Sequence, residues 1–446
     1  MDKKERILRS VGRPLGGAKL PHFKNTAECE SVIMPAPATV SIPLQQHIGA
    51  PCEAIVKVGD KVYVGTKIGD SDKLVCAPVH SSVSGTVKKI AEVTPKNGIP
   101  VKMVEIESDG EMTVDPAIGP INVETEEDLV NAARQCGLVG LGGAGFPAHV
   151  KLRKREDVEL DTLIINGAEC EPYITADYRE CIEHAEDILD GVYLIKKILR
   201  LKKVIICVED NKPAAIEKLY EIATSELDPD NEVQVMKLKS RYPQGAEKVL
   251  IYSATKRKLP LGKLPSDVGC IVMNITSVSA LSKYIKTGMP LVAKRLTVDG
   301  KAVANPQNVI VPLGTAVQEV IDFCGGFTQE PDKIIMGGPM MGNTIVSTDA
   351  VVAKPNNAIL CIKDVKGPAQ TACIKCGRCI AACPMKLTPA AVDTAIARNI
   401  GSAEMFEEMN VSYCMECGCC AYVCPAKRSL VQAMRYAKSE IRRNAK

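Results

Sequence analysis

The chain has 446 residues, of which 46% are hydrophobic and 24% are charged, and its formal net charge is +3. This balance predicts several folded domains. It argues against a strongly basic nucleic-acid surface, and the absence of tryptophan argues against a base-stacking platform, so we expect no nucleic-acid partner. Nineteen cysteines are many for this length. Because the first residues lack an apolar secretion signal and no stretch is apolar enough to span a membrane, reduced, metal-binding thiols are favoured over disulfides.

The first part of the chain predicts a tail followed by a small β domain. Residues 1–28 look like an extended, loosely held tail. Residues 29–112 contain short alternating strands between glycine-rich turns, in two similar halves, which predicts a barrel-sandwich hybrid like that of biotinyl and lipoyl carriers. Carriers present a modified lysine about where Lys73 stands. The residues around Lys73 do not match a carrier hairpin, so a structural or docking domain is favoured.

Residues 113–290 alternate between helical and strand patterns. An amphipathic helix is expected at 124–138, and a second helix near 179–200. Buried strands are expected at 161–167, 202–209, 233–238 and 269–275. Strands that alternate with helices predict a mostly parallel α/β sheet.

The remaining residues predict two further domains. Residues 291–348 turn β-rich again, and 295–327 shows a hairpin, a helix and a turn, which is typical of a small β-grasp (SLBB-like) module. Residues 349–446 are mostly helical and contain the cysteine clusters. The predicted fold class is therefore multidomain α/β plus α+β.

Two cysteine runs have the spacing C-x2-C-x2-C-x3-C followed by proline, which is the spacing of bacterial two-cluster ferredoxins. In that arrangement the fourth cysteine of each run ligates the other [4Fe–4S] cluster. Cluster one is then assigned to Cys373, Cys376, Cys379 and Cys424, and cluster two to Cys414, Cys417, Cys420 and Cys383.

Zinc is the alternative metal, but a zinc site needs only four ligands and no trailing proline, so iron–sulfur fits better. Cys419 could replace Cys420 as a ligand, although the spacing favours Cys420. The thirty residues between Cys383 and Cys414 have a helical pattern. This link predicts the α-helical type of two-cluster ferredoxin.

A glycine-rich loop, GLVGLGGAGFP (137–147), follows the first predicted helix, and NGAECEP begins at the end of the predicted strand 161–167. A dense glycine loop lets backbone amides approach a flat or anionic ligand. Ligands of open α/β sheets bind beyond the carboxyl ends of strands. The two motifs together predict a ligand crevice, and the loop lacks the lysine of a nucleotide-hydrolysing P-loop.

The motifs LGGAGFPAHVK and NGAECEP resemble the flavin-binding motifs of the NADH-binding subunit of respiratory complex I. The chain is more similar still to the RnfC family of Rnf-type ferredoxin:NAD oxidoreductases, in the same domain order, from about residue 30 to 430. The resemblance implies FMN as cofactor and NAD(H) as substrate. By motif match, the cofactor-binding residues are Gly140, Gly142, Gly143, Gly145, Phe146, Lys151, Asn166, Glu169, Glu171, Tyr242, Glu247 and Asn274.

The implied function is that of the NAD(H)-facing peripheral subunit of an ion-translocating complex at the cytoplasmic face of the membrane. Its partners would be integral membrane subunits and iron–sulfur subunits, with ferredoxin acting indirectly. Hydride transfer to a flavin needs no general acid or base, so no catalytic residue is expected. Ala168 and Leu141 depart from the complex I motifs.

Two other functions remain open at this point. A flavin-dependent cobalamin reductase of microcompartments has the same modules, and a non-catalytic iron–sulfur conduit would have lost its flavin. The basic, helical segment 427–446 is interpreted as a solvated helix, with docking to a partner or to anionic lipid as the alternative.

Overall fold

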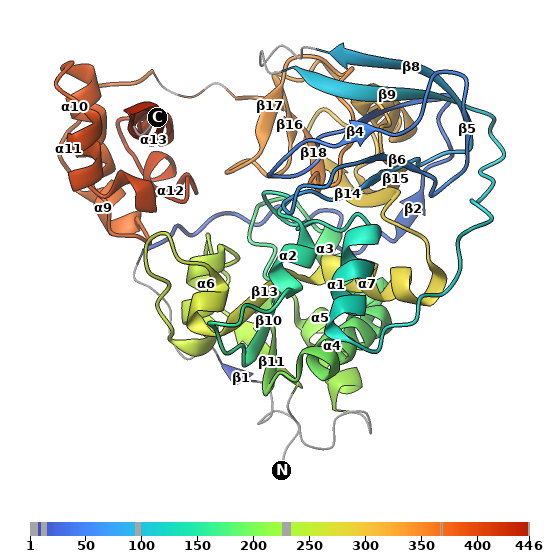
Figure 1. Ribbon diagram of the computed structural model, residues 1–446. Coiled ribbons are helices and arrows are strands. Elements are labelled where there is room, and N and C mark those ends of the chain that lie inside the picture. Colours follow the sequence, from blue (N-terminus) through green and yellow to red (C-terminus); the bar gives the residue numbers. More distant parts are fainter. Residues whose placement is uncertain are drawn as a thin grey trace.

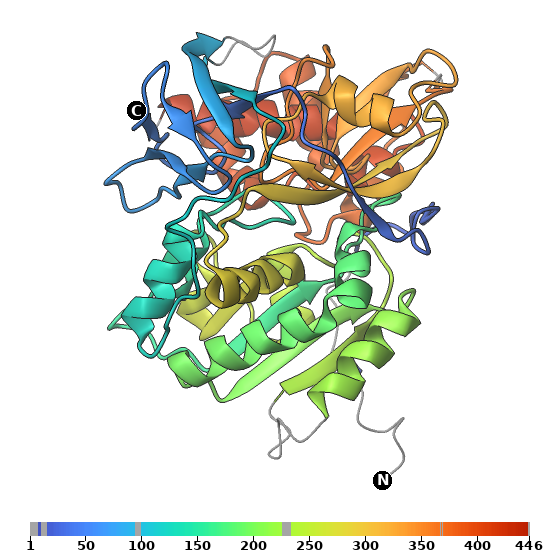
Figure 2. The same ribbon diagram turned by 90° about the vertical axis from the view of Figure 1, so that its right-hand side faces the viewer.

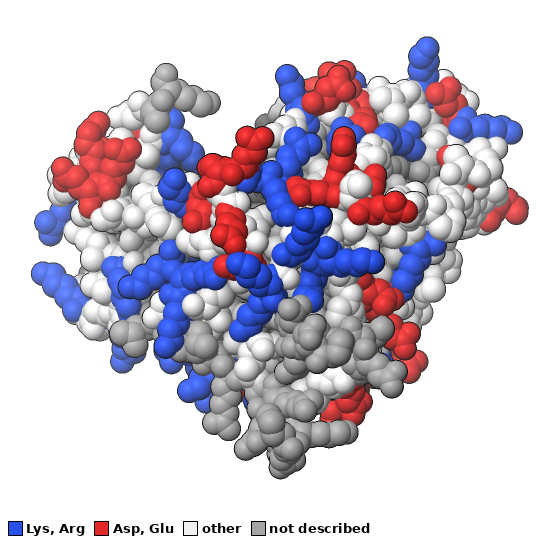
Figure 3. Space-filling view, turned by 60° about the horizontal axis from the view of Figure 1, so that its bottom comes forward, with Lys and Arg blue, Asp and Glu red and all other residues white. Residues whose placement is uncertain are grey.

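The computed structural model describes residues 8–9, 16–93, 100–224, 233–365, 367 and 369–444. Figure 1 shows an α/β layer below, two groups of strands above it, and the C-terminal helices set apart at the left. Within the described residues, no helix has the length and apolar character needed to cross a bilayer. Figure 3 shows Lys and Arg side chains spread across the middle of one face with acidic side chains among them, so this face does not carry charge of a single sign.

The first β domain consists of two small antiparallel sheets that share one core of buried side chains, including Val40, Ile68 and Ile106. This arrangement confirms the predicted barrel-sandwich hybrid. The four-stranded sheet has the order β3 (Thr39–Pro43), β9 (Val101–Ser108), β8 (Gly85–Val93), β5 (Lys61–Val62). The three-stranded sheet has the order β4 (Glu53–Ala54), β6 (Lys67–Asp70), β7 (Val79–His80).

The α/β domain contains a parallel five-stranded sheet with helices on both faces (Figure 2). Its two central strands, TLIING and KVIICVE, are almost entirely buried, which explains their continuous apolar sequence. The strand order is β1 (Leu8–Arg9), β12 (Val233–Leu238), β11 (Lys203–Glu209), β10 (Thr162–Gly167), β13 (Cys270–Asn274).

The helices of this domain are α1 (Glu126–Gln135), α2 (Ala148–Leu152), α3 (Ala176–Glu183), α4 (Ala185–Leu199), α5 (Pro213–Ala223), α6 (Glu247–Thr255) and α7 (Ile275–Thr287), with a short 3₁₀ turn at Pro265–Val268. The single helix expected near 179–200 is in fact two. His184 has a non-helical backbone (φ −135°) and separates α3 from α4. The break lets Glu183, at the end of α3, bind Arg295 of the next domain at 2.8 Å.

The third unit is a mixed six-stranded sheet covered by α8 (Val317–Phe323). Its order is β17 (Asn343–Ile345), β16 (Lys333–Met336), β18 (Ala358–Ile362), β14 (Ala293–Asp299), β15 (Gln307–Pro312), β2 (Ser31–Ile33). The structure differs from the expected boundaries here. β2 pairs with β15 rather than with the barrel, and β18 lies beyond residue 348, because both strands complete the hydrogen bonding of this sheet.

The C-terminal domain is helical, as expected, with a small core around Phe406 and Met434. Its elements are α9 (Arg378–Ala382), α10 (Pro389–Ala397), α11 (Ala403–Glu408), a 3₁₀ turn at Val411–Tyr413, α12 (Cys419–Tyr422) and α13 (Leu430–Asn444). The basic segment expected to be helical after 427 is α13. One of its faces is buried, and Lys438 binds Glu416 at 2.7 Å, so this helix is packed rather than fully solvated.

The expectation of a loosely held tail is wrong for its described part. Ala18 and Leu20 are buried, and Ala18 pairs with Tyr242 through two backbone hydrogen bonds of 2.8 and 3.1 Å. Gly17 donates to the carbonyl of Ala382 in the C-terminal domain at 2.7 Å. This segment is held because it fills the junction between the α/β domain and the cysteine-rich domain. Most of residues 1–15 lie outside the described residues.

Candidate functional site

The predicted site residues lie along the carboxyl edge of the parallel sheet. Asn166 is the last residue but one of β10 and stands in register with Asn274, which ends β13. The Asn166 side chain donates to the carbonyl of Gly245 on the neighbouring loop at 2.9 Å. Asn274 caps α7 by accepting from the amide of Ser277 at 3.2 Å. Two asparagines on adjacent parallel strands therefore stand at the edge where such sheets bind ligands, and we call this edge the crevice.

The glycine-rich loop covers this edge. Leu141 is buried, and its amide donates to the hydroxyl of Ser277 at 3.1 Å, which attaches the loop to the start of α7. A Cβ on Gly142 would lie 2.5 Å from Nδ2 of Asn274, so only glycine fits there. The loop closes on itself where the Gly140 amide donates to the carbonyl of Phe146 at 2.9 Å.

The exposed turn of the loop has the properties that a phosphate-bearing flavin requires. Gly142 and Gly143 are exposed, and their amides donate to no acceptor in the described part of the chain. A Cβ on Gly143 would meet nothing within 4 Å, so the backbone is open to a ligand on that side. Gly145 adopts φ 69°, a left-handed conformation that favours glycine. Free amides on an open glycine turn fit the phosphate end of FMN.

Lys151 and Glu247 form an ion pair beside the loop. The Lys151 ammonium lies 3.3 Å from Oε2 of Glu247, at the start of α6, and also donates to the carbonyl of Val272 at 3.2 Å. Both side chains are partly exposed. The pair therefore stands at the rim of the crevice, where each charge remains accessible to a bound ligand.

The two acidic side chains of NGAECEP are turned away from solvent and have different partners. Glu169 accepts from the amide of Asp177 at 2.6 Å and lies 3.9 Å from the ammonium of Lys24. Burial raises the pKa of Glu169 to about 7 and lowers that of Lys24 to about 8. Lys24 also donates to the carbonyls of Glu169, Glu171 and Ile174. Lys24 therefore holds residues 169–174 through three backbone carbonyls and the Glu169 carboxylate.

Glu171 connects the α/β domain to the six-stranded sheet. Its carboxylate accepts from the amides of Met340 and Met341, both at 3.0 Å, in the turn between β16 and β17. Burial raises the pKa of Glu171 to about 7. Tyr242 is buried next to it, and burial together with the charges of Glu171 and Cys170 raises the pKa of the Tyr242 phenol. Both residues lie at a domain junction rather than in the crevice.

The eight predicted cluster cysteines line two separate cavities in the C-terminal domain. One cavity is lined by Cys383 together with Cys414, Cys417 and Cys420, and Cys419 lines it as well. The other is lined by Cys373, Cys376 and Cys379 together with Cys424. In each cavity three of the predicted ligands come from one run and the fourth comes from the other, which is the crossed arrangement expected from the spacing.

The two cysteine runs have matching backbone conformations. Left-handed residues recur at equivalent positions, as Lys375 and Glu416 and as Gly377 and Gly418. The Lys375 amide donates to the sulfur of Cys373, and the Glu416 amide to that of Cys414, each at 3.4 Å. Such N–H donors stabilise a negatively charged sulfur cage and raise its reduction potential. The repeated loops therefore have the chemistry of an iron–sulfur site.

The two cavities differ in their distance from the flavin crevice. A Cβ on Gly418, in the run Cys414–Cys424, would lie 3.2 Å from Cε of Met340, the residue whose amide binds Glu171. Cys419 donates to the carbonyl of Tyr242 at 3.8 Å. In the other run, Cys373 and Cys376 are exposed. We call the cavity next to Tyr242 the inner cavity and the one lined by Cys373 and Cys376 the outer cavity.

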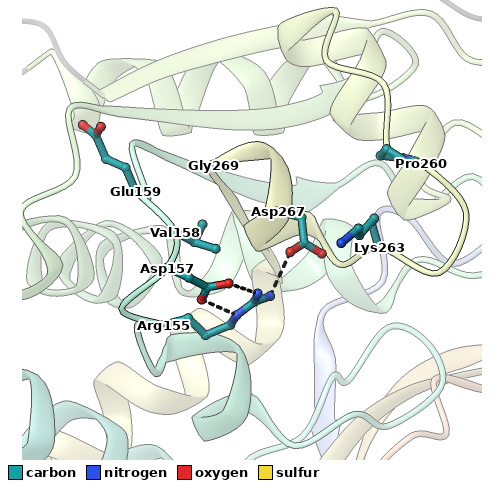
Figure 4. A pocket seen from close by; sticks show the side chains of 8 residues that line it. All are labelled: Arg155, Asp157, Val158, Glu159, Pro260, Lys263, Asp267 and Gly269. Atoms are coloured by element: carbon teal, nitrogen blue, oxygen red, sulfur yellow. Dashed lines mark hydrogen bonds and ion pairs between the residues drawn. The ribbon is translucent and has the colours of Figure 1, made fainter.

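A cavity of about 380 Å³ lies at the opposite, amino edge of the sheet. Figure 4 shows that Arg155 lies between Asp157 and Asp267 there, with ion-pair distances of 2.6 and 2.9 Å. Arg155 is thus already paired with two carboxylates. Ligands of open α/β sheets bind beyond the carboxyl ends of the strands, so this cavity is not the candidate site.

Sequence reasoning missed Asp177, Lys212 and Lys24, whose side chains form hydrogen bonds with the predicted site residues or their neighbours. Asp177 accepts from Asn274 at 2.8 Å and from Thr276 at 2.6 Å, and Lys212 donates to the carbonyl of Ala168 at 2.8 Å. Lys212 follows the end of β11 by three residues, which is a signal that could have found it. Asp177 lies in the first turn of α3. Lys24 gives no such signal, because its partners stand 145 to 150 positions away.

Comparison with known families gives four consecutive matches. Residues 13–111 match the RnfC barrel sandwich hybrid domain, and residues 133–283 match the Nuo51 FMN-binding domain. Residues 295–344 match the SLBB domain, and residues 368–425 match the 4Fe-4S dicluster domain. The matches confirm the predicted fold class and both kinds of cofactor domain.

Several curated relatives resemble the chain over nearly its whole length. It is 44% identical to the C subunit of the Na(+)-translocating ferredoxin:NAD(+) oxidoreductase complex of Acetobacterium woodii, over 96% of each chain. It is 43% identical to the C subunit of the proton-translocating complex of Clostridium ljungdahlii, over 94% of this chain and 92% of the relative. The C subunit of the ion-translocating oxidoreductase complex of Rhodobacter capsulatus is 41% identical, with coverage of 94% and 81%.

A solved structure supports the fold independently. A chain of an NAD+-reducing [NiFe]-hydrogenase in the air-oxidized state superposes with a TM-score of 0.51 at 18% sequence identity. The superposition covers 71% of this chain and 62% of the hydrogenase chain. At this identity the likeness shows a shared fold and nothing about activity.

Proposed function

Because this chain belongs to the RnfC family, whose members are subunits of ion-translocating ferredoxin:NAD(+) oxidoreductase complexes, we propose that it is the NAD(H)-facing subunit and that the crevice at the glycine loop holds FMN. The chain is an oxidoreductase subunit with an FMN-binding domain and a two-cluster [4Fe–4S] domain. FMN, when bound, supplies the exchange between hydride and single electrons. The open amides of Gly142 and Gly143 support its placement, with Asn166, Asn274, Lys151 and Glu247 around it.

We propose the two cluster assignments from the same geometry. Cys414, Cys417, Cys420 and Cys383 hold the inner cluster, and Cys373, Cys376, Cys379 and Cys424 hold the outer one. The inner cluster is close to the crevice through Met340 and Tyr242. The outer cluster faces the surface. Single electrons then pass between the crevice and a partner in the order FMN, inner cluster, outer cluster.

The protein itself has three tasks in this scheme. The loop amides and the pair Lys151–Glu247 orient the bound groups, and Lys24 together with Glu171 keeps the acidic loop in place. The buried surroundings of Tyr242 exclude water between the crevice and the inner cluster. The scheme gives none of these residues a proton-transfer role, because hydride exchange with a flavin needs no general acid or base.

An anaerobic titration with NADH, followed by absorbance and by EPR, tests the proposal. In the wild-type chain, NADH should bleach flavin absorbance and give signals from two reduced clusters. In Cys376→Ser, which alters the outer cluster, NADH should still reduce the inner cluster. In Cys420→Ser, NADH should reduce the flavin but neither cluster. Cys207→Ser, a buried cysteine in β11, is the control. Full reduction of the outer cluster in Cys420→Ser would refute the proposed order.

We also propose that the surface around the outer cluster docks an iron–sulfur or membrane subunit of the complex, at the cytoplasmic face of the membrane. The exposed apolar side chains of Ile374 and Ile380 beside Cys376 support this position. Ile374→Glu should reduce co-purification with the other subunits at least tenfold and leave both clusters intact. Ile400→Glu is the control, because Ile400 is exposed to a similar extent in the same domain. Equal loss in both variants would contradict this position.

A further inference from the structure

The barrel-sandwich domain contains a second group of metal-ligating side chains, separate from the eight cluster cysteines. His47, Cys52 and Cys76 are all buried, with exposed fractions of 7%, 3% and 0%. Their ligand atoms lie within 4.8 Å of one another, and no other such group occurs within the part of the chain that the structure describes. Neither the flavin crevice nor the ferredoxin-like domain uses these residues.

The distances within this group suit a tetrahedral ion. The sulfurs of Cys52 and Cys76 lie 3.4 Å apart, and the sulfur of Cys76 lies 3.6 Å from Nε2 of His47. Sulfur and nitrogen ligands on a tetrahedral zinc ion stand about 3.6–3.8 Å from each other, given its usual bond lengths. Small shifts of the side chains would therefore complete three corners of a zinc site without moving the backbone.

The surroundings orient the ligands. Nδ1 of His47 lies 3.3 Å from the carbonyl of Ile48, a contact that directs Nε2 toward the two thiols. Metal-binding histidines commonly hold a backbone carbonyl with their second nitrogen in this way. Nε2 accepts from the amide of Ala77 at 3.0 Å. When the ion takes that lone pair, the amide can donate to a metal-bound thiolate.

A further buried histidine contacts the same segment of the barrel. His149, on α2, is 2% exposed, and its Nε2 contacts the carbonyl of Leu74, two residues before Cys76, at 2.9 Å. Its Nδ1 is buried without a hydrogen-bond partner among the described residues. His149 is not part of the group of ligand atoms within 4.8 Å, so the group itself offers an ion three protein ligands.

We propose that His47, Cys52 and Cys76 bind one zinc ion. Zinc is the metal chosen because it prefers mixed thiolate and imidazole ligands in tetrahedral geometry. The ammonium of Lys354 is fully buried nearby and favours the deprotonated thiols that zinc requires.

The position of this site suggests a structural role next to the flavin loop. A Cβ on Gly145 would lie 3.2 Å from the carbonyl of Gln46 and 3.5 Å from Cα of His47. The ion would fix His47, against which Gly145 packs, and so support the glycine loop from the side of the barrel-sandwich domain.

The test measures zinc and iron in the full chain, purified anaerobically from zinc-supplemented cells and desalted. We expect about one zinc per chain beside about eight irons. Cys52→Ala/Cys76→Ala should lose at least tenfold of the zinc with unchanged iron, whereas Cys207→Ala, which removes a buried cysteine elsewhere, should keep it. Zinc content unaffected by the double substitution, or less than a tenth of an equivalent in the wild type, would overturn the site.

A second measurement does not depend on whether the variant folds. Zinc K-edge X-ray absorption of the wild-type chain reports only on zinc, whatever the iron content. We expect about two sulfurs near 2.3 Å and at least one nitrogen near 2.0 Å. Coordination by four sulfurs would assign the zinc to misloaded cluster cysteines, and coordination by oxygen alone would show surface binding. Either result would refute the proposal.

Discussion

At the scale of single residues, the conformation of residues 169–174 depends on Lys24, which lies outside the motif NGAECEP. The ammonium of Lys24 binds three backbone carbonyls, of Glu169, Glu171 and Ile174, and faces the Glu169 carboxylate. A buried charge that loses its partner is costly, because it has no water to replace the lost contacts. Lys24 therefore sets the conformation of the loop more directly than the loop residues do.

Lys24→Met should destabilise the chain by about 3 kcal/mol, since it removes the ammonium that faces the Glu169 carboxylate and donates to three carbonyls. Thermal unfolding monitored by circular dichroism measures this. Lys19→Met is the matched control: Lys19 is exposed on the same segment, and its substitution should change stability by less than about 0.5 kcal/mol. Similar melting temperatures for the two variants would contradict the assigned role.

Glu171 predicts a dependence of stability on pH. Burial raises its pKa to about 7, so the folded state binds a proton more tightly than the unfolded state between about pH 4.5 and 7. The contribution of Glu171 to stability is therefore fully present below about pH 4.5 and is lost as the pH rises through 7, by about 3 kcal/mol.

Glu171→Gln abolishes this titration and removes one acceptor for the Met340 and Met341 amides at every pH. We expect the variant to be less stable than the wild type at pH 5.5 and the difference to shrink by pH 8. Melting temperatures at the two pH values measure it. Glu127→Gln, at an exposed position of α1, is the control. A difference independent of pH would show that Glu171 does not titrate in this range.

At the scale of elements, two neighbouring glycines of the loop differ in the space around them. Gly142 is required by the protein, because a Cβ there would meet the Asn274 side chain, which Asp177 holds in place at 2.8 Å. Gly143 is open on that side. The loop therefore combines a fixed attachment to α7 with a free surface for the ligand.

Gly142→Ala should destabilise the cofactor-free chain by about 1–3 kcal/mol, because the Asn274 amide must leave its hydrogen bonds to make room. Gly143→Ala should leave the melting temperature of the cofactor-free chain unchanged. FMN affinity, measured by quenching of flavin fluorescence, should fall at least tenfold in Gly142→Ala and stay constant in Gly119→Ala, which adds a methyl group with no neighbour within 4 Å. Normal affinity in Gly142→Ala would separate the loop from the flavin.

At the scale of the whole molecule, the C-terminal domain depends on its clusters more than the other domains do. Its two cavities are lined by nine thiols, eight of them predicted cluster ligands, and its apolar core is small. The parallel sheet, in contrast, lies in a large continuous core. Metal binding and folding are therefore coupled in one domain and not in the other.

Removal of iron by oxidation and chelation should unfold the C-terminal domain and leave the sheet intact. Hydrogen–deuterium exchange, read by mass spectrometry, should show at least tenfold faster exchange over 373–424 in the iron-free chain. Strand β10 should keep its protection, because it pairs with a strand on each side and its core contains no cluster ligand. Uniform loss of protection over both regions would show that the domains fold as one unit.

Some features could be predicted because they depend on short stretches of chain. The cluster spacing encodes both the metal and the crossed pairing, since three thiolates on one short loop match one cage. The continuous apolar runs of β10 and β11 indicated a buried parallel sheet, and the asparagines at the strand ends indicated its crevice. Local spacing and periodicity were enough for the fold class and for the kind of chemistry.

The tertiary structure alone decided which distant residues meet. Glu171 binds amides 169 and 170 positions away, which makes it part of a domain junction rather than of the flavin crevice. The tail, interpreted as loose, supplies Lys24 across 145 positions. Cys52 and Cys76 looked like scattered apolar residues until the barrel brought them to 3.4 Å. Contacts between distant residues depend on how whole domains pack, and no local pattern of the chain records that.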